Sequence, residues 1–538
     1  MSTPQGHVLM TTLAVGPPAI GAAAYLLQWG ALTHMSIAAK TLCALAYAYV
    51  MKKAVIYYFF TSPFRHKPTP DGANLLVGHV LRTFEGSPGE GFLRMMNEVP
   101  NDGFIVFQGW LHCYPNILLT SPELCLEVLN THAADWEKMA DGRAFLARII
   151  GNGLVVVEGS EHREQRKNIA PAFSGRAIKD LVPLFWSKGM SLARAAKREA
   201  GVRDGTVDIM ELASRATLDI IGSAGLGKDF ASLEDSEHEV VQVYSEITDP
   251  RKGSLVFLFV ITQLFPLWLG PLLPLPANWR LNRATAGLRR IMKKLLSEKS
   301  EDMQKKGEEQ KDLIAMLMRS GKFSDDGLTD QLLTFLAAGH ETTAGAMTWS
   351  AYLISKHTDV QDRLRKECQD VCGNADVDTI TAEMIDSMHY LDAVCNEVLR
   401  VYPLVANTSR ISVRPTQVGG MVFPKDTAVV ISPWALNRLP ALWGHDAEEF
   451  RPERWMGPEG KHGGAKSPYA FMTFIYGPRT CIGASFARSE LKCLLATLLM
   501  HFELRLKKPD EVPVPSGAIT IKPKDGMEII VTEIKSPI

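Results

Sequence analysis

The sequence predicts a mainly α-helical fold with small antiparallel β-sheets. Stretches with helical periodicity dominate the chain after residue 80, and strand-like runs are shorter and fewer. The order is some strands, then many helices, then strands mixed with helices, instead of a regular alternation of the two. This order is typical of a helical domain with minor sheets and not of repeated βα units.

The predicted elements follow from the spacing of apolar residues, which recur every three to four positions in the helices and form short bounded runs in the strands. Helices are expected over residues 281–305, 328–356, 358–373, 382–401 and 484–502. Strands are expected over residues 103–110, 116–120, 421–432 and 527–532.

Length and composition exclude several classes of protein. The 538 residues would allow roughly 3–4 domains of ~150 residues each. A formal charge of -1 with 22% charged residues gives no reason to expect a nucleic-acid partner. The eight cysteines are spread along the chain, which fits a reducing compartment better than a disulfide scaffold.

The N-terminus predicts a membrane anchor over residues 1–62. Residues 8–27 form an uncharged apolar stretch about long enough to span a bilayer. A second stretch, about residues 36–60, contains lysines that make it a less secure span, and it could instead lie at the interface. A buried helical hairpin is the alternative. Positive charges follow the anchor, so the positive-inside rule places the rest of the chain in the cytosol.

A proline-containing linker is expected over residues 63–79, because Pro68 and Pro70 stop any helix there. The catalytic body would then comprise residues 80–538. Within it, residues 254–276 are as apolar as a membrane span but contain four prolines in their second half. We expect a helix followed by an apolar loop that covers a substrate pocket or dips into the membrane surface; a core segment is the alternative.

Cys481 lies in a glycine-containing turn ahead of a predicted helix, in FIYGPRTCIGASFARSELK, residues 474–492. Backbone N–H groups and the positive end of the helix dipole favour a thiolate there. Gly483 permits close approach of a bulky group, and Arg479 adds a fixed positive charge. Such a thiolate can be a nucleophile or a metal ligand. A nucleophile would need a histidine as its base. A metal ligand could bind haem iron, which is known to take an axial thiolate.

A second pattern is LLTFLAAGHETTAGAMTW, residues 332–349. This apolar helical stretch carries Gly339, Glu341 and Thr342 in its middle. A helical glycine costs ~1 kcal/mol relative to alanine, and threonine hydroxyls can bond back to the preceding turn. The pattern suggests room for a ligand and a proton relay; a helix–helix crossing through small residues is the alternative.

Two pairs of residues share helical faces. Glu397 and Arg400 are three positions apart and can pair. His162 and Arg166 are four positions apart, with further basic residues beside them, and could bind anionic groups such as carboxylates. A solvated basic face is the alternative for the second pair. The segment FRPERW adds Arg454.

Together these motifs resemble the cytochrome P-450 superfamily of haem-thiolate monooxygenases. FIYGPRTCIG fits the family's F-x-x-G-x-R-x-C-x-G haem-binding loop at every fixed position, and AGHETT fits its oxygen-activating helix. Glu397-x-x-Arg400 and FRPERW fit two further motifs in the expected order. The likeness runs from about residue 65 to the end of the chain. It implies a single, mainly α catalytic domain despite the length.

The resemblance implies roles for these residues. Cys481 would be the axial ligand of the iron of heme b, with Phe474 beside the sulfur and Gly483 allowing the haem to approach. Glu341 and Thr342 would be the acid–alcohol pair that delivers protons to dioxygen. The haem propionates would be held by Arg479, Arg410, His162 and Arg166. A structural triad would be formed by Glu397, Arg400 and Arg454.

Two positions depart from the family pattern. The family commonly has tryptophan where this chain has His162, which can still donate a hydrogen bond. It frequently has a histidine–arginine pair where this chain has Asn437 and Arg438. Little consequence is expected from the second change.

The resemblance also implies partners. No flavin or nicotinamide site is recognisable, so electrons would come from an NADPH-cytochrome P-450 reductase in the membrane. A basic docking face is expected from Arg163, Lys167, Arg488 and Lys492. The implied location is the endoplasmic reticulum membrane, with the catalytic domain facing the cytosol.

By family analogy the substrate pocket is mostly apolar and takes a lipophilic small molecule together with dioxygen. It would draw on Phe145–Ile150, residues 254–276, Phe335–Ala338, Val405–Thr408 and Ala518–Ile519. The chain is similar to fungal members that oxidise terpenoid or polyketide-type secondary metabolites. The alternatives are a xenobiotic or fatty-acid hydroxylase, a reductase-independent peroxygenase or rearrangement enzyme, a haem-binding sensor, and a cysteine-nucleophile transferase.

Overall fold

The computed structural model describes most of the chain after residue 61. The described residues are 62–74, 77–109, 115–235, 239–248, 257–258, 269–306, 312–373, 375–458, 460–517 and 519–534, with Thr41, Leu45 and Ala48. The predicted spans at 8–27 and 36–60 lie outside these residues except for those three, and so does most of the 254–276 segment. No helix within the described ranges is both long enough and apolar enough to cross a membrane.

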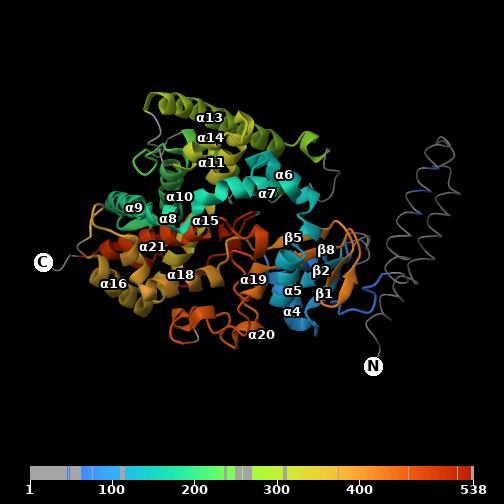
Figure 1. Ribbon diagram of the computed structural model, residues 1–538. Coiled ribbons are helices and arrows are strands. Elements are labelled where there is room, and N and C mark those ends of the chain that lie inside the picture. Colours follow the sequence, from blue (N-terminus) through green and yellow to red (C-terminus); the bar gives the residue numbers. More distant parts are fainter. Residues whose placement is uncertain are drawn as a thin grey trace. The chain divides into compact units, whose positions relative to one another are not determined.

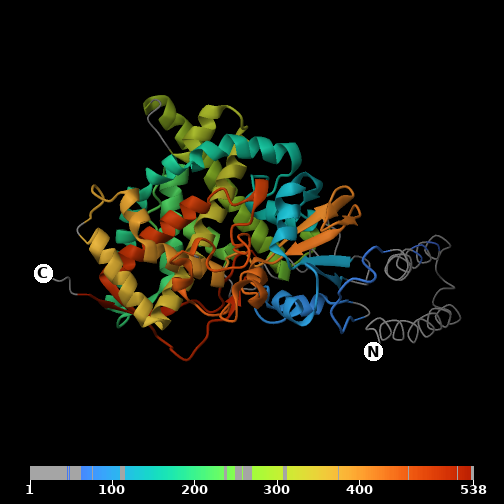
Figure 2. The ribbon, with the colours of Figure 1, turned by 60° about the horizontal axis from the view of Figure 1, so that its bottom comes forward.

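The chain forms two compact units. The first comprises Met1–Trp136 and Asn407–Ala435, and the second comprises Glu137–Ala406 and Leu436–Ile538. In the first unit, blue strands from the early chain and orange strands from residues beyond 400 form one sheet (Figures 1 and 2). The short helix α19 (Pro433–Leu436) runs from the first unit into the second.

The main sheet of the first unit has the strand order β1-β2-β8-β5-β3. Its strands are β1 (Phe104–Gln108), β2 (Pro115–Leu119), β8 (Ala428–Ile431), β5 (Thr408–Ser412) and β3 (Trp136–Glu137). Strands β2 and β8 are parallel, with Asn116 opposite Ala428. The predicted small antiparallel sheets are thus present, with this parallel pair as an addition that the sequence did not predict. Parallel strands need a long crossover, and here more than 300 residues separate the two strands.

The predicted strand over 421–432 is two strands. β7 (Met421–Phe423) pairs with β6 (Thr416–Val418) through a turn at Gly419 and Gly420, which have φ angles of 56° and 75°. β8 follows a second turn. Helices α3 (Val80–Thr83), α4 (Glu90–Glu98) and α5 (Pro122–Leu126) complete the first unit.

The stretch predicted as a linker packs within the first unit. The Phe64 side chain is 1% exposed, and its ring centroid lies 5.2 Å from that of Phe423. The Val106 N–H donates to the Pro68 carbonyl at 2.8 Å. The ring of the buried His79 accepts from the Gln108 N–H at 2.9 Å. This stretch therefore contacts β1 along its length.

The second unit is mainly helical. Its helices are α6 (Ala140–Ile150), α7 (Gly159–Ile169), α8 (Gly175–Lys179), α9 (Val182–Val202), α10 (Ile209–Ile221), α11 (Glu239–Thr248), α13 (Pro276–Lys306), α14 (Leu313–Ser320), α15 (Asp325–Lys356), α16 (Thr358–Cys372), α17 (Ala382–Ser387), α18 (His389–Val401), α20 (Pro440–Trp443) and α21 (Ala484–His501). The helix predicted over 382–401 is divided into α17 and α18, because Met388 leaves the helical region with a ψ of 86°.

Helix α15 forms the core of the second unit. The Ser324 side chain accepts from the Gly327 N–H, and Asp325 and Asp326 lie in the first turn, where carboxylates stabilise a helix N-terminus. The helix packs against α10, α13, α18 and α21. Most of its residues are buried, so the few exposed ones indicate where it meets open space.

Small sheets complete the second unit. An antiparallel sheet has the order β4-β12-β9, formed by β4 (Thr206–Asp208), β12 (Glu528–Glu533) and β9 (Phe502–Leu506). A second pair is formed by β10 (Pro515–Ser516) and β11 (Lys522–Pro523). Strand β11 also contacts α15, which brings residues near the C-terminus to the middle of that helix.

Candidate active site

Cys481 lies in a tightly bonded loop immediately before α21. Its N–H donates to the Phe474 carbonyl at 3.0 Å, and the Thr480 hydroxyl donates to the Ile475 carbonyl at 3.0 Å. Ile475 has a φ of 49°, which is a strained conformation for a β-branched residue, and Gly477 has a φ of 76°. The loop thus holds the cysteine in place at the expense of backbone strain.

The Cys481 thiol is reachable by solvent although protein surrounds it. A Cβ atom added to the neighbouring Gly483 would meet only the Phe173 ring, at an ordinary distance of 3.8 Å. The loop therefore borders open space. Burial raises the pKa of the Cys481 thiol, while the Gly483 N–H and Arg166 lower it less. The thiol form is therefore favoured in the chain without a metal ion, whereas a coordinating metal ion deprotonates a thiol outright.

Basic residues gather beside this loop. Arg479 donates to the Val157 carbonyl at 2.8 Å and pairs with Glu158, which also accepts from Lys138 at 3.2 Å. Burial lowers the pKa of Arg479 to about 10, so it stays cationic at neutral pH. One carboxylate therefore serves two cations.

Of the predicted pair on α7, Arg166 adds to this positive charge, whereas His162 is a neutral hydrogen-bonding group at neutral pH. Arg166 donates to the Thr480 carbonyl at 2.8 Å, directly beside Cys481 in the chain. His162 is 4% exposed, and burial together with Lys138 and Arg166 lowers its pKa to about 4. We refer to Lys138, His162, Arg166 and Arg479 as the basic cluster. It contains more cations than carboxylates, which is costly unless an anion joins it.

Arg410 belongs to the first unit and has its hydrogen-bond partners there. It is 3% exposed and donates to the Thr408 hydroxyl and the Ser409 carbonyl, both at 2.7 Å. No described carboxylate pairs with it, and burial lowers its pKa to about 10. It is a buried guanidinium without a counter-charge in the described part of the chain.

The middle of α15 presents a narrow open face. Ala338 is exposed although its helix is otherwise buried, and Thr342 is half-buried one turn further on. The Thr342 hydroxyl donates to the Ala338 carbonyl at 2.8 Å. A Cβ atom at Gly339 would lie 2.8 Å from the Ile221 side chain. Gly339 therefore allows α15 to pack closely against α10, which is the alternative interpretation of this motif. The open face of α15 is formed by Ala338 and Thr342.

Glu341 forms a buried ion pair with Lys522. The Nζ and Oε1 atoms are 2.6 Å apart, and the two side chains are 10% and 8% exposed. The predicted acid and alcohol are adjacent in sequence, but Thr342 bonds to its own helix and Glu341 bonds to β11. The structure does not bring the carboxylate and the hydroxyl into direct contact. Lys522 was not among the predicted site residues.

A second buried acid lies nearby and was also not predicted. Glu490 of α21 is 0% exposed, and neither carboxyl oxygen has a hydrogen-bond partner among the described residues. Burial raises the pKa of Glu490 well above its ordinary value, with Thr343 opposing the shift. Burial therefore favours the neutral form of this carboxyl group. In the sequence, Glu490 is marked only as the single acidic residue in the apolar stretch of α21.

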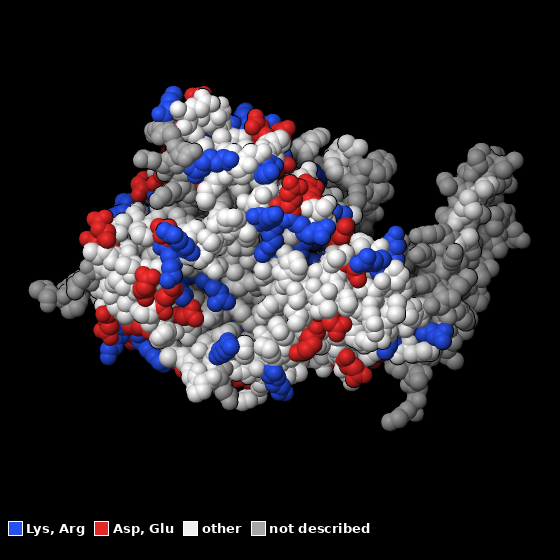
Figure 3. Space-filling view, viewed as in Figure 1, with Lys and Arg blue, Asp and Glu red and all other residues white. Residues whose placement is uncertain are grey.

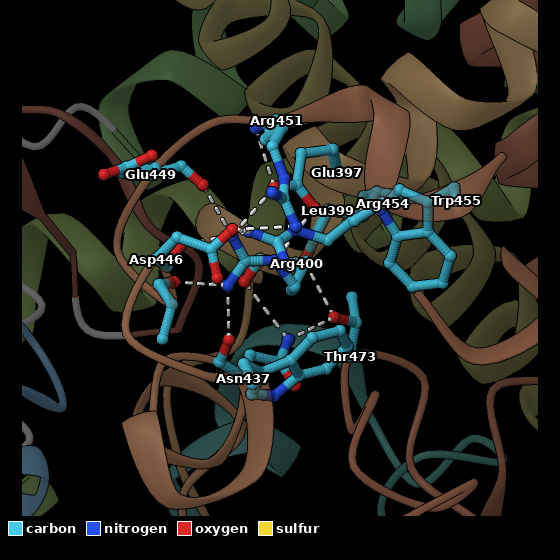
Figure 4. A network of polar contacts seen from close by, with 12 residues as sticks. Glu397, Leu399, Arg400, Asn437, Asp446, Glu449, Arg451, Arg454, Trp455 and Thr473 are labelled. Atoms are coloured by element: carbon cyan, nitrogen blue, oxygen red, sulfur yellow. Dashed lines mark hydrogen bonds and ion pairs between the residues drawn. The ribbon is translucent and has the colours of Figure 1, made fainter. Parts of the chain in front are cut away.

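The predicted triad forms a closed network in the second unit (Figure 4). Arg400 donates to both oxygens of Glu397 at 2.8 Å, and Arg454 donates to Glu397 at 2.8 Å. The Trp455 indole adds a bond at 2.9 Å. Burial would raise the pKa of Glu397, but the hydrogen bonds and charges of Arg400 and Arg454 outweigh it and lower that pKa.

Asn437, where little consequence of the departure from the family pattern is expected, also joins this network. Its carbonyl accepts from Arg400 at 2.8 Å, and its side-chain amide donates to the Thr473 hydroxyl at 2.8 Å. Its side-chain oxygen accepts from the Met472 N–H at 2.8 Å. Asn437 therefore joins the triad to the segment that leads into the Cys481 loop.

One of the four predicted docking residues is buried: Lys492 is 8% exposed and pairs with Asp392 at 2.6 Å. Its burial argues against a place in a docking face. Arg488 is half-buried and lies over the Phe474 ring, 5.1 Å from its centroid. Arg163 and Lys167 of α7 are exposed. Lysine and arginine side chains gather on the face where Figure 1 draws α7 (Figure 3).

The sequence matches the Cytochrome P450 family over residues 68–529. The chain belongs to this family. It is 40% identical over 502 residues to cytochrome P450 monooxygenase sphH of Aspergillus fumigatus, covering 91% of this chain and 92% of that protein. It is 34% identical to FSL4 of Gibberella zeae, with 88% and 89% covered, and 32% identical to ptmK of Penicillium ochrochloron, with 89% and 95% covered.

The residues of this P450 fit the haem that the family binds. The Cys481 thiol borders open space, as an axial ligand requires. The excess positive charge of the basic cluster suits the two carboxylates of a haem. The lack of close neighbours around a Cβ at Gly483 leaves its surroundings open to a bound group.

Proposed function

We propose that this P450 monooxygenase inserts one atom of dioxygen into a lipophilic small molecule, with Cys481 as the axial ligand of heme b. The observation that carries this proposal is the Cys481 thiol, which faces open space from a strained loop beside the basic cluster. An inert structural cysteine would be enclosed, as Cys493 is on the next turns of α21.

The bound haem would supply oxygen activation, and the chain's own residues would hold and insulate it. The loop between Phe474 and Cys481 fixes the position of the sulfur. Arg479, His162 and Arg166 would bind the propionates, with Arg410 as a further candidate. Glu397, Arg400 and Arg454 would keep the loop's support rigid.

Proton supply would use the hydroxyl of Thr342, which lies on the open face of α15. Glu341 can donate protons only if its carboxylate leaves Lys522 or exchanges a proton with that lysine. The Thr342→Ala variant should release more hydrogen peroxide per NADPH consumed. Thr348→Ala is the matched control, because Thr348 makes the same bond to its helix but is fully buried. Equal peroxide release by both variants would contradict this role.

Electrons would come from an NADPH-cytochrome P-450 reductase that docks on the exposed basic residues of α7. Arg163 and Lys167 have no ion-pair partner among the described residues, and exposed Arg176 at α8 extends the surface. The double variant Arg163→Glu/Lys167→Glu should raise the Michaelis constant for reductase. An unchanged constant would exclude this face.

The chain would be held in the endoplasmic reticulum membrane by residues 1–62, with 63–79 as the connection and 80–538 as the catalytic domain facing the cytosol. The uncharged stretch 8–27 and the lysines that follow support this topology. Sedimentation of the full chain with membranes, and its release when residues 1–62 are removed, would test it.

The substrate would be a terpenoid or polyketide-type secondary metabolite. Exposed apolar residues support a lipophilic ligand: Ala338 is exposed on α15, and Val405 is 40% exposed in the segment after α18. The fungal origin of the matched monooxygenases supports secondary metabolism.

The deciding experiment is the carbon monoxide difference spectrum of the reduced, purified protein. Thiolate ligation should shift the Soret band far to the red in the wild type. Cys481→Ser should abolish that band, and Cys493→Ser should keep it, since Cys493 is buried in α21. Folded wild-type protein without haem absorbance would overturn the proposal.

A further inference from the structure

A polar pocket lies in the second unit between α6, α13 and α15. Its volume is about 220 Å³, and it is lined by residues that include Arg148, Asn282, Thr285, Arg289 and Leu333. Helix α6 packs against both α13 and α15. This space is enough for about seven water molecules, or for the head group and first carbons of an organic acid.

The two arginines of the pocket differ in their partners. Arg289 pairs with Asp330, so that its charge is neutralised. Arg148 donates only to two amide oxygens, to Asn278 Oδ1 at 3.0 Å and to Asn282 Oδ1 at 3.1 Å. Across the described residues no carboxylate lies within ion-pair distance of Arg148. The pocket therefore carries one uncompensated positive charge.

The position of Arg148 makes that charge costly. The side chain is half-buried, and burial lowers the pKa of its guanidinium. Both amide bonds are made by one terminal nitrogen, so the other N–H groups of the guanidinium remain available. The free Nε–H and Nη1–H groups can each donate a charge-assisted hydrogen bond to a carboxylate oxygen.

We propose that this pocket binds the carboxylate of an acidic, otherwise apolar substrate through Arg148. This inference rests on the proposed monooxygenase function and names the substrate class for it. Arg148 acts as a binding residue that sets which end of the substrate stays away from the haem.

The open face of α15 begins about one helical turn beyond the pocket. Leu333 lines the pocket, and Ala337 lies on the same face one turn later, about 6 Å along the helix axis. Ala337 is half-buried, and the exposed Ala338 follows it. A carboxylate at Arg148 would thus place the apolar chain of the same molecule along α15.

Binding of dodecanoic acid and of its methyl ester to the full, haem-loaded protein should be measured by calorimetry. The two probes have the same apolar chain and differ in the charge. The wild type should bind the acid more tightly. Arg148→Gln should weaken acid binding about 10- to 100-fold, the usual range for a lost charge-assisted bond, with the ester changed less than about twofold. Arg148→Lys should retain part of the preference.

Arg290→Gln is the matched control, because Arg290 is 78% exposed on the same helix as the pocket's Asn282. It should leave both affinities unchanged. Absence of acid binding by the wild type, equal binding of acid and ester, or equal weakening of both by Arg148→Gln in a variant with native circular dichroism would each overturn the inference. The carbon monoxide spectrum separately reports haem ligation, so failure of the acid site is distinguishable from failure of the proposed function.

Discussion

The Glu397 network and the basic cluster are both polar assemblies inside the second unit, and they differ in how completely their charges are matched. In the network, one carboxylate receives both arginines, and the remaining donors of Arg400 reach backbone carbonyls. In the basic cluster, Lys138 and Arg479 share Glu158, and His162 has no ring partner among the described residues.

This difference distinguishes a network that supports the fold from a cluster that binds an anion. A buried group whose partners are all within the chain contributes to a fixed arrangement. A group of cations without sufficient carboxylates is stable only if an external anion completes it. The predictions that follow test this contrast, beginning with the largest expected effect.

Glu397→Gln should lower the free energy of unfolding by about 3–5 kcal/mol, because it leaves the buried Arg400 without its counter-charge and Arg454 with Asp446 alone. Urea unfolding followed by fluorescence measures this change. Glu533→Gln is the control, since Glu533 pairs with Lys197 on the surface, where the side chains are 57% and 62% exposed. The control should change stability by less than about 1 kcal/mol. A small effect of Glu397→Gln would mean that the network is not structural.

Lys522→Met should lower the free energy of unfolding by about 3 kcal/mol, because it leaves Glu341 buried and unpaired. The double variant Glu341→Gln/Lys522→Met should recover much of this loss, which a double-mutant cycle would detect. Lys508→Met, in a pair that is 69% and 54% exposed, is the control. Additive losses in the double variant would show that the two side chains do not depend on each other.

Acid should act on the network through Glu397. Its pKa is lowered in the folded protein, so its contribution to stability is present above the ordinary pKa of a glutamate and is lost as pH falls through the folded value. Unfolding free energies measured between pH 7 and pH 3 should therefore decline more steeply for the wild type than for Glu397→Gln. Parallel pH profiles would argue against this carboxylate as a source of acid sensitivity.

Arg166→Gln should have the smallest effect on folding, about 1 kcal/mol or less, because it removes one cation from a cluster that has too many. The same variant should lose haem faster to apomyoglobin than the wild type does. If haem retention is unchanged and stability falls as far as in Glu397→Gln, the basic cluster belongs with the structural network.

The sequence predicted the helical core well because periodicity is a local property. The helix predicted over 328–356 is observed as Asp325–Lys356, and the one predicted over 484–502 is observed as Ala484–His501. The break at Met388 was missed, since nothing in the periodicity marks a residue whose ψ departs from the helical region. Family motifs indicated the positions of Glu397, Arg400 and Arg454, and the structure brings them together.

Other features depend on pairs that are distant in sequence. The parallel pairing of β2 with β8 and the partnership of Glu341 with Lys522 each join segments that carry no reciprocal local signal. Asn437 was judged by the residue it replaces, whereas its importance comes from three hydrogen bonds to other segments. The pKa of the Cys481 thiol depends on desolvation as well as on the helix terminus, and only the helix terminus is visible in the sequence.

The ion pair between Glu341 and Lys522 also has a consequence for synthesis. The two residues are 181 positions apart, so α15 leaves the ribosome long before its carboxylate can find its partner. At about 5–20 residues per second, that interval lasts roughly 10–40 seconds. During this time the nascent helix carries an unmatched acid at its centre, and its final packing must follow release of nearly the whole chain. The core of this enzyme is therefore completed after translation, when the C-terminal strands arrive.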